Sequence, residues 1–248
     1  MQIFGLSDIG QQRSENQDAF RFEVIEPGIA VFVVCDGMGG ARGGNVASTI
    51  ASEVFLEHMK RDIRPHISEK YARSILLNAI NFANYEVYKK SVSEADYKGM
   101  GTTLIGGFCQ DDSGFLANIG DSRAYYLSAD AISRITRDHS VVEDLIVHGH
   151  LTEEQARKHP RRNLITRALG TDEKVEADYY PFRLSGSDML LLCTDGLTGP
   201  VEDAALHALY KDHTTPESCA HALIDAANAA GGPDNITALL LCVQEGGI

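Results

Sequence analysis

The sequence lacks any apolar run long enough to cross a membrane. Its 248 residues are 44% hydrophobic, an ordinary fraction for a globular protein, and no stretch approaches the roughly 20 apolar residues of a transmembrane helix. The first residues also lack the basic start and long apolar segment of a signal peptide. We therefore expect a cytoplasmic protein that does not act at a membrane.

Cysteines and basic residues are scarce as well. The five cysteines are odd in number, and Cys35, Cys193 and Cys242 stand inside apolar runs, which is typical of buried thiols in a reducing compartment and not of a disulfide framework. Only 22 Lys and Arg residues stand against 35 Asp and Glu residues, which gives a net charge of −13. This charge argues against a general nucleic-acid binder, because such proteins present a basic face.

The chain shows no internal repeat, low-complexity tract or long linker, and its length fits one large domain. Apolar patterns and turn residues predict strands at 2–8, 18–25, 30–35, 103–109, 114–119, 123–128, 131–135, 189–193 and 236–243. Helical spacing predicts two helices after residue 40, the second capped by Ser68, and a late helix that begins at Pro216.

The order of these elements predicts the fold class. Strands come in runs and helices in pairs, so a parallel βαβ fold is disfavoured. The segments 30–35, 189–193 and 238–243 are apolar on both faces, whereas an antiparallel sheet with one solvated face would show alternation. Both observations fit an α+β fold in which two antiparallel sheets pack together beneath outer helices, a four-layer α-β-β-α sandwich.

Two apolar runs lead into Asp-Gly pairs. "VFVVCDGMGG" carries Asp36 and "LLLCTDG" carries Asp195, and a third aspartate, Asp234, stands just before the last predicted strand. A turn explains each of them singly. A dinucleotide-binding glycine loop at Asp36 is disfavoured, because Arg42 replaces its third glycine and an anionic aspartate would repel a pyrophosphate.

A shared metal site explains the three aspartates together. Carboxylates, with a glycine that lets a backbone carbonyl approach, supply the oxygen ligands that hard divalent cations prefer, and no Lys or Arg adjoins Asp36, Asp195 or Asp234. Asp121 in "IGDSR" and Asp18 in "ENQDAF" give weaker signals, since the first fits a hairpin turn and the second a solvated strand start. The sequence contains no H-E-x-x-H, paired C-x-x-C, EF-hand or P-loop motif.

Six ordered motifs make the sequence similar to a known family. "RSENQD", "CDGMGG", "GMGTTL", "IGDSR", "CTDGL" and "GGPDNIT" occur in the order and at about the spacing of the PPM family, the metal-dependent serine/threonine protein phosphatases of the protein phosphatase 2C type. The resemblance runs from about residue 5 to residue 243. It implies a single phosphatase catalytic domain over residues 1–248 with the same α-β-β-α sandwich.

The resemblance also implies a set of metal ligands. Asp36 would bridge two Mn²⁺ or Mg²⁺ ions, the Gly37 carbonyl would bind the second ion, and Asp195 and Asp234 would hold the first. Asp121 matches the aspartate that, in bacterial members, helps to hold a third, weaker ion together with Asp195.

The catalytic roles follow from the same resemblance. Arg13 matches the arginine that grips the substrate phosphate, and Asp18 matches the acidic residue that orders metal-bound water. Two metals about 3.5–4 Å apart lower the pKa of a bridging water, and the hydroxide attacks phosphorus in line, without a phospho-enzyme. The forked donors of an arginine suit phosphate oxygens, although without the resemblance Arg13 is better interpreted as a surface arginine near a turn.

Two residues depart from the family pattern. Gln17 stands where many relatives have a glutamate ligand to the second metal, so that ion would depend mainly on Asp36, Gly37 and waters. Met38 stands where eukaryotic relatives have a histidine proposed to protonate the leaving group. The leaving-group acid is therefore unassigned, with a metal-bound water, His139 and His159 as candidates; either histidine also reads as an ordinary loop residue.

A polar insert is expected at about residues 136–176. It carries two capping boxes, which begin at Ser140 and Thr152 and predict two short helices, the first ended by Gly149. Residues 134–167 hold seven Arg or Lys residues against five Asp or Glu residues, a local basic excess in an acidic chain. The insert resembles the family's flap, which touches the protein part of the substrate, although a solvated helical excursion explains it as well.

The leading hypothesis is a bacterial-type phosphatase that hydrolyses phosphoserine and phosphothreonine in proteins. Its expected partners are phosphorylated proteins, including a cognate serine/threonine kinase that it opposes, and it is expected to be a monomer. Two alternatives stay open at this point. One is a catalytically weak member that binds phosphoproteins, and the other is a metal-dependent hydrolase of small phosphoesters.

Overall fold

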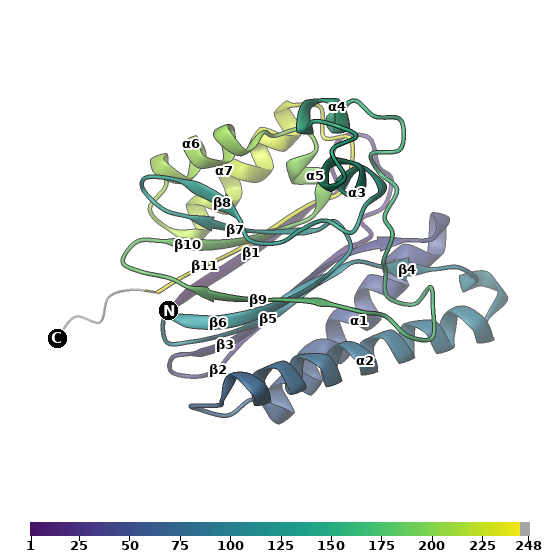
Figure 1. Cartoon of the computed structure of the whole chain (residues 1–248), viewed down its shortest axis with the longest axis horizontal. Helices are drawn as coiled ribbons and strands as arrows, with labels where there is room; N and C mark the ends of the chain where they lie inside the picture. Colours follow the sequence, from purple (N-terminus) through teal and green to yellow (C-terminus); the bar gives the residue numbers. More distant parts are fainter. Residues whose placement is uncertain (244–248) are drawn as a thin grey trace.

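Two antiparallel sheets pack face to face in the computed structural model, and helices cover both outer faces (Figure 1). The structure describes residues 1–243, without the side chains of residues 40–42, so residues 244–248 of the expected domain lie outside the described part. The prediction of an α+β sandwich of two antiparallel sheets with flanking helices is confirmed.

Each sheet combines strands that lie far apart in the sequence. Sheet A consists, in spatial order, of β1 (Gln2–Asp8), β11 (Ile236–Cys242), β10 (Met189–Cys193), β7 (Arg123–Leu127) and β8 (Ile132–Arg134). Sheet B consists of β2 (Asp18–Glu26), β3 (Ile29–Met38), β5 (Leu104–Gln110), β6 (Ser113–Ile119) and β9 (Asp178–Arg183), and the short β4 (Gly101–Thr102) pairs with the end of β3. Sequence reasoning did not predict β9.

The apolar character of both strand faces follows from this layering. Phe32 and Val34 of β3 pack between the sheets against residues such as Leu190 of β10. Their neighbour Val33 points the other way, into the core beneath the helices that cover sheet B, and Leu191 does the same beneath the helices of sheet A. Because successive side chains of a strand alternate between faces, a sheet that is covered on both sides needs continuous apolar strands.

Most of the helices were predicted from the sequence at the positions where they occur. The long helices α1 (Gly40–Asp62) and α2 (Glu69–Ser93) cover sheet B, while α5 (Asp195–Thr198), α6 (Asp203–Asp212) and α7 (Pro216–Ala229) cover sheet A; a single 3₁₀ turn (Ala95–Tyr97) follows α2. Ser68 caps α2 by accepting from the Tyr71 N–H, and Thr215 caps α7 ahead of Pro216. Sequence reasoning did not predict α5 and α6.

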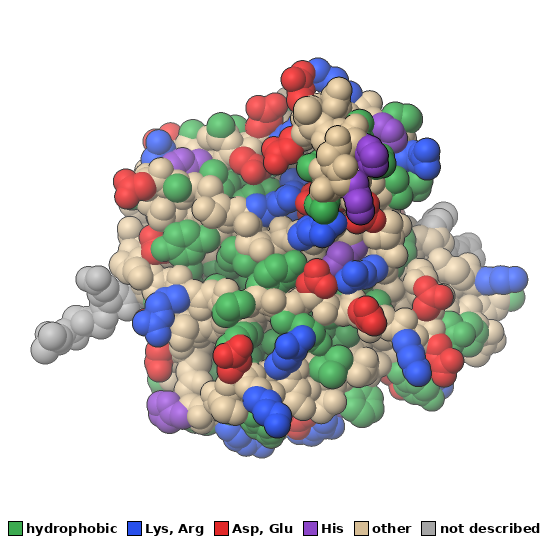
Figure 2. Space-filling model, viewed as in Figure 1, with side chains coloured by type: hydrophobic (Ala, Val, Ile, Leu, Met, Phe, Trp, Pro, Cys, Tyr) green, Lys and Arg blue, Asp and Glu red, His purple; other side chains and the backbone are tan. Residues whose placement is uncertain are grey.

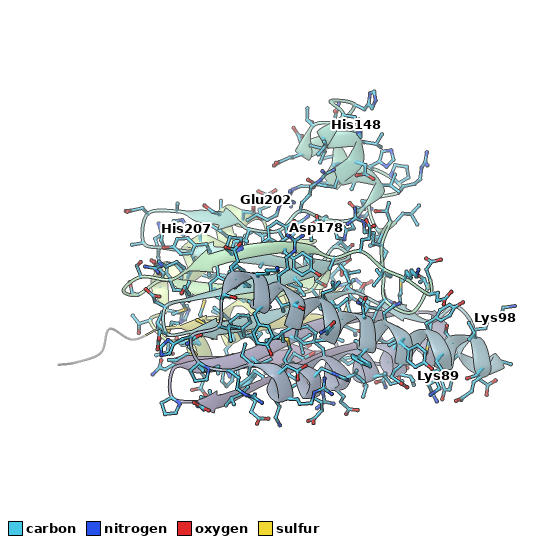
Figure 3. All side chains as sticks on the ribbon, turned by 60° about the horizontal axis from the view of Figure 1, so that its bottom comes forward. Lys89, Lys98, His148, Asp178, Glu202 and His207 are labelled. Atoms are coloured by element: carbon cyan, nitrogen blue, oxygen red, sulfur yellow. The ribbon has the colours of Figure 1, made fainter. Side chains whose placement is uncertain are left out.

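Residues 136–176 form an excursion above the sheets, called the flap segment below. It contains α3 (Val141–Val147) and α4 (Glu153–Arg157), and Figures 1 and 3 show these helices, with His148, projecting away from the sandwich. Thr152 forms its predicted capping box in full. The box at Ser140 forms only in part, because the Glu143 side chain accepts from Arg134 at 3.1 Å instead of reaching back to the helix start.

The turn that carries Asp121 is not the hairpin that the sequence suggested. The strand before it, β6, belongs to sheet B, and the strand after it, β7, belongs to sheet A, so the chain crosses between the sheets here. A Gly-Asp pair between two apolar strands looks the same locally in either connection, and only the distant partners of the strands distinguish them. Gly120 has φ +103°, which places the crossing in backbone that favours glycine.

The described residues also show the character of the helices, the cysteines and the charged surface. No helix in residues 1–243 has both the length and the apolar character that spanning a membrane would demand. All five cysteines are free and buried. Figure 2 shows acidic and basic side chains interspersed over one face of the molecule, without segregation by sign.

A buried asparagine ties the end of the flap segment to the body of the protein. Asn84 of α2 is 2% exposed, its amide nitrogen donates to the Asp172 and Glu173 carbonyls, and its oxygen accepts from the Gly170 N–H. Three backbone groups of residues 170–173 thus depend on one side chain.

Replacing this asparagine should destabilise the fold. Asn84→Ala leaves the three backbone groups without their partner, so the free energy of unfolding should fall by about 1–3 kcal/mol, measured by urea unfolding followed by circular dichroism. Asn78→Ala, at an exposed position of the same helix, is the matched control and should stay within about 0.5 kcal/mol of the parent chain. Equal losses in the two variants would contradict the anchoring role.

Candidate active site

Five aspartates from both sheets meet at one end of the sandwich. Asp18 begins β2 and Asp36 lies near the end of β3, and the two are direct partners in the register of sheet B. Asp195 follows β10 and starts α5, while Asp234 stands just before β11, so these two arrive from sheet A. Asp121 lies in the crossing between β6 and β7 and completes the group.

A cavity of about 480 Å³ opens over this cluster. All of the predicted site residues except Asp18 line it, and Asp18 lies beside them against the ends of β10 and β11. The lining residues are Arg13, Ser14, Glu15, Gln17, Asp36, Gly37, Met38, Gly39, Thr103, Asp121, Asn163, Ile165, Asp195, Asp234 and Asn235. The structure therefore brings together residues that the sequence analysis could group only by their similar positions at strand ends and by resemblance to a family.

Backbone contacts hold Asp36 and Gly37 in place. The Asp36 N–H donates to the Thr103 hydroxyl at 2.9 Å, and the Asp36 carbonyl accepts from the Thr103 N–H at 2.9 Å and the Thr102 hydroxyl at 2.8 Å. Gly37 is packed so closely that a Cβ there would collide with the Gly44 carbonyl at the start of α1. Only glycine fits this position, because the backbone of α1 approaches it directly.

Asp234 and Arg13 form an ion pair at the cavity edge. The Arg13 Nη2 donates to Asp234 Oδ2 at 2.6 Å, and the Asp234 Oδ1 accepts from the Asn235 N–H at 2.8 Å. The Arg13 side chain is 52% exposed, so it stands where a ligand arriving from solvent would meet it.

Asn235 organises the loop that carries Arg13, and sequence reasoning missed it. Its Oδ1 accepts from the Gln17 N–H at 2.8 Å, and its Nδ2 donates to the carbonyls of Ile9 and Glu15 at 3.0 and 2.9 Å. The side chain is 5% exposed. The sequence offered only an Asp-Asn pair before a strand, which equally fits a turn.

The electrostatics of the cluster are those of crowded, buried anions. Burial, followed by the charges of Asp18 and Asp195, raises the pKa of Asp36 well above its ordinary value, and burial with the Asp234 charge raises the pKa of Asp195. Burial also raises the pKa of Asp18 to about 7, although hydrogen bonds from two threonines oppose this, and it raises the pKa of Asp121 to about 8 with help from Asp195. Because these carboxylates are buried and repel one another, bound cations or protons are needed to neutralise them.

The donor set fits hard divalent cations. The candidate ligands are carboxylate oxygens and the Gly37 carbonyl, and no histidine or cysteine of the described part of the chain lines the cavity, so the site suits Mg²⁺ or Mn²⁺ better than softer metals. Asp18 Oδ1 is buried and has no hydrogen-bond partner within residues 1–243, as expected of an oxygen that can take a ligand. Within residues 1–243 no three acidic, His or Cys side chains already surround one ion position; Asp36 and Asp195 instead lie within hydrogen-bonding reach of each other.

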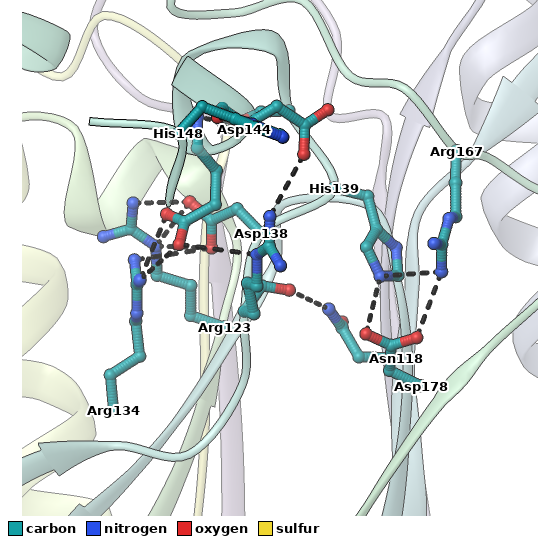
Figure 4. A network of polar contacts seen from close by, with 12 residues as sticks. Asn118, Arg123, Arg134, Asp138, His139, Asp144, His148, Arg167 and Asp178 are labelled. Carbon is teal, nitrogen blue, oxygen red and sulfur yellow. Dashed lines mark hydrogen bonds and ion pairs between the residues drawn. The ribbon is translucent and has the colours of Figure 1, made fainter. Parts of the chain in front are cut away.

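The two candidate histidines lie outside the cavity lining. His139 is 5% exposed; its Nδ1 accepts from the Gly120 N–H at 3.1 Å, and its Nε2 lies 3.3 Å from Asp178, which also pairs with Arg167 (Figure 4). His159 accepts from the Arg161 N–H through its Nδ1. Neither histidine faces the aspartates, so the structure does not support either of them as the leaving-group acid.

The flap segment borders the cavity at its return to the body. Asn163 and Ile165 are lining residues, while Arg161 and Arg162 are exposed just before them and lie outside α4. Below them the segment is fixed, since the Thr166 N–H donates to the His139 carbonyl and Ser140 bridges to Ile165.

Known proteins resemble this chain over nearly its whole length. The family model described as protein phosphatase 2C matches residues 7–222. A Listeria innocua protein named serine/threonine phosphatase stp is 38% identical over 238 residues, which cover 95% of this chain and 93% of that protein.

Solved structures agree with the sequence matches. The serine/threonine phosphatase Stp1 from Staphylococcus aureus superposes with a TM-score of 0.91 at 35% identity, covering 98% of this chain and 95% of the other. The catalytic domain of the serine/threonine protein phosphatase PstP, solved in complex with 2 manganese ions, superposes with a TM-score of 0.85 at 31% identity, covering 98% of each chain.

Removing one of the crowded charges should stabilise the metal-free protein. An acid whose folded-state pKa is raised destabilises the fold where it is ionised, so the penalty at Asp121 is absent below its ordinary value of 3.8 and complete above about 8. Asp121→Asn, unfolded in urea with EDTA, should gain about 1 kcal/mol or more above pH 8 and nothing near pH 4. The exposed Asp130→Asn should show no gain at either pH, and a gain at Asp121 that did not depend on pH would contradict the electrostatic account.

Proposed function

The chain belongs to the protein phosphatase 2C family and is a serine/threonine protein phosphatase, and we propose that its five clustered aspartates hold the divalent ions on which the phosphatases of this family depend. The observation that carries the proposal is the collection of buried, crowded carboxylates from both sheets around one cavity, where the candidate ligand atoms are oxygens. Phosphorylated proteins are the substrates.

The aspartates divide into two groups by their place in the fold. Asp36 and the Gly37 carbonyl, at the end of β3, face Asp195 and Asp234 across the join of the sheets, and this supports two core ions of Mn²⁺ or Mg²⁺ with Asp36 between them. Asp121 and Asp195 would share a third, weaker ion. When bound, the ions supply Lewis acidity and an activated water for attack on phosphorus.

The protein's own residues contribute the remaining parts of the reaction. Arg13 stands at the rim with an exposed guanidinium, whose paired donors can take two phosphate oxygens and orient the ester over the aspartates. Asp18 accepts hydrogen bonds from Thr194 and Thr237 through Oδ2, while its Oδ1 has no hydrogen-bond partner among the described residues and can take part in ordering a metal-bound water. Met38 lines the cavity and no histidine of residues 1–243 does, which favours water as the source of the proton for the leaving alkoxide.

The flap segment would provide the protein-binding part of the site. Its residues 163 and 165 reach the cavity, and its exposed arginines lie next to them, where they can meet an acidic phosphorylated partner. We also propose that the partners include a cognate serine/threonine kinase. The enzyme would act as a monomer in the cytoplasm. The five buried free thiols support a reducing compartment.

Metal dependence is the first test. Phosphate release from a phosphothreonine peptide should stop after dialysis against EDTA and return with Mn²⁺ or Mg²⁺. Asp36→Asn, Asp195→Asn and Asp234→Asn should each lose most of the turnover and weaken Mn²⁺ binding in calorimetry, because each removes a charged oxygen ligand. Asp225→Asn, exposed on α7, should retain both properties; turnover that persisted in EDTA would overturn the proposal.

The flap arginines give a second test. Arg161→Ala with Arg162→Ala should slow dephosphorylation of a phosphoprotein about 5-fold to 10-fold, since exposed ion pairs contribute up to about 1 kcal/mol each, and should leave p-nitrophenyl phosphate unaffected. Lys89→Ala with Lys98→Ala removes the same charge at the far end of the molecule from His148 (Figure 3) and should change neither rate. A parallel loss on both substrates would contradict substrate docking.

A further inference from the structure

A chain of hydroxyl groups on β1 and β11 and at the end of β10 ends on Asp18 of sheet B. Asp18 Oδ2 accepts from the Thr194 hydroxyl at 2.9 Å and from the Thr237 hydroxyl at 2.6 Å. The Thr237 hydroxyl lies 2.8 Å from that of Ser7, which in turn accepts from the Asn16 amide at 2.8 Å. Thr194 and Thr237 are both 0% exposed, so no solvent competes for these bonds.

The hydrogens of this chain can all point toward Asp18. The Thr194 oxygen already accepts from the Thr237 N–H at 3.0 Å, so its own hydrogen is available for the carboxylate. The Thr237 hydroxyl gives its hydrogen to Asp18 and can accept from Ser7. With Asp18 ionised, every hydroxyl donates once and accepts once, and the carboxylate receives two hydrogen bonds on one oxygen.

The other carboxylate oxygen of Asp18, Oδ1, has a different environment. Asp18 Oδ1 is buried and has no hydrogen-bond partner among the described residues. Asp18 and Asp36 are register partners on β2 and β3, so their side chains leave the same face of sheet B and stand side by side. An unpartnered buried oxygen beside other carboxylates is costly unless a ligand completes it.

Thr194 does not form the capping hydrogen bond that its position usually provides. It occupies the N-cap position of α5, where a threonine usually accepts from a helix N–H, yet its side chain makes no capping bond. Its hydroxyl serves Asp18 instead. The residue that follows it is Asp195, so the same short segment places one aspartate of sheet A and holds one aspartate of sheet B.

We propose that Thr194 and Thr237 are positioning residues that fix Asp18 through Oδ2 and thereby present Oδ1 to the divalent-ion site. This inference rests on the proposed function, because it concerns how the metal-binding cluster is held. The two threonines act only through Asp18, and since they belong to sheet A they also lock the two halves of the cluster in one arrangement.

The test compares two substitutions at the same position of the full chain. Thr237→Val keeps the shape of the side chain and removes the hydroxyl, while Thr237→Ser keeps the hydroxyl. Thr237→Val should weaken Mn²⁺ binding in calorimetry by about 10-fold or more, the size of effect found when a partner of a metal ligand is lost. It should also lower kcat on a phosphothreonine peptide with little change in KM. Thr237→Ser should remain close to the parent chain in both measurements.

Two controls separate positioning from loss of packing. Ser91→Ala removes a buried hydroxyl that bonds the Tyr88 and Gly170 carbonyls and not Asp18, and should leave Mn²⁺ affinity unchanged. In the Asp18→Asn background, Thr237→Val should add no further loss of Mn²⁺ affinity, because its only route to the metal is already removed. If Thr237→Val fails to fold, the pair Thr194→Val and Thr194→Ser serves the same comparison.

The outcomes distinguish this inference from the function on which it rests. If Asp18→Asn leaves both Mn²⁺ affinity and kcat unchanged, the proposed role of Asp18 in the site is wrong. Suppose instead that Asp18→Asn lowers Mn²⁺ affinity and kcat. If Thr237→Val then matches the parent chain, or if Thr237→Val and Thr237→Ser lose equal Mn²⁺ affinity and kcat, the role of Asp18 in the site is supported and the positioning role of the threonines is overturned. Loss in the Val variant, rescue in the Ser variant and no added loss beside Asp18→Asn would support the proposal.

Discussion

The packing of sheet A against sheet B is the constraint on which the active site depends, because each sheet carries only part of the carboxylate cluster. Asp18 and Asp36 are fixed by sheet B, and Asp195 and Asp234 by the ends of strands in sheet A. The interface between the sheets consists largely of aliphatic and aromatic side chains, which resist separation but hold relative position only through shape. The polar bonds from the sheet A threonines to Asp18 add a directional contact where position matters most.

The charge of the cluster opposes folding and has to be offset elsewhere. Burial and mutual repulsion raise the pKa values of four of the five aspartates, so the metal-free fold carries groups that are less stable ionised here than in the unfolded chain. Three separate apolar cores, two under the helices and one between the sheets, supply the opposing stabilisation. At this cluster the local rule that buried charges should be paired is broken, and divalent ions can complete it there, as expected of a functional site.

Sequence reasoning succeeded where a local pattern had one structural meaning. Apolar runs of the right length gave the strands that end at Asp36 and Asp195, and capping residues gave the starts of α2 and α7. It failed where the meaning depended on distant partners. The crossing at Asp121 looked like a hairpin, and nothing in the local sequence marked the roles of Thr194 and Thr237, because their partner Asp18 lies 176 and 219 residues away in the chain. Whether each aspartate binds an ion remains a prediction that rests on resemblance.

The residues proposed to carry out the chemistry and those proposed to recognise the substrate lie on different parts of the fold. Most of the aspartates lie at or next to the ends of paired strands of the two sheets, which suits groups that must keep their positions to fractions of an ångström. The flap segment extends from the body on short helices. Its base is tied down through Asn84 at residues 170–173 and through the bonds of His139 to Gly120 and residue 166, and Arg134 of β8 holds Glu143 of α3. Because that base is anchored next to the Asp121 crossing while the exposed arginines lie beyond it, changes in the outer segment can alter which proteins are bound without disturbing the carboxylates.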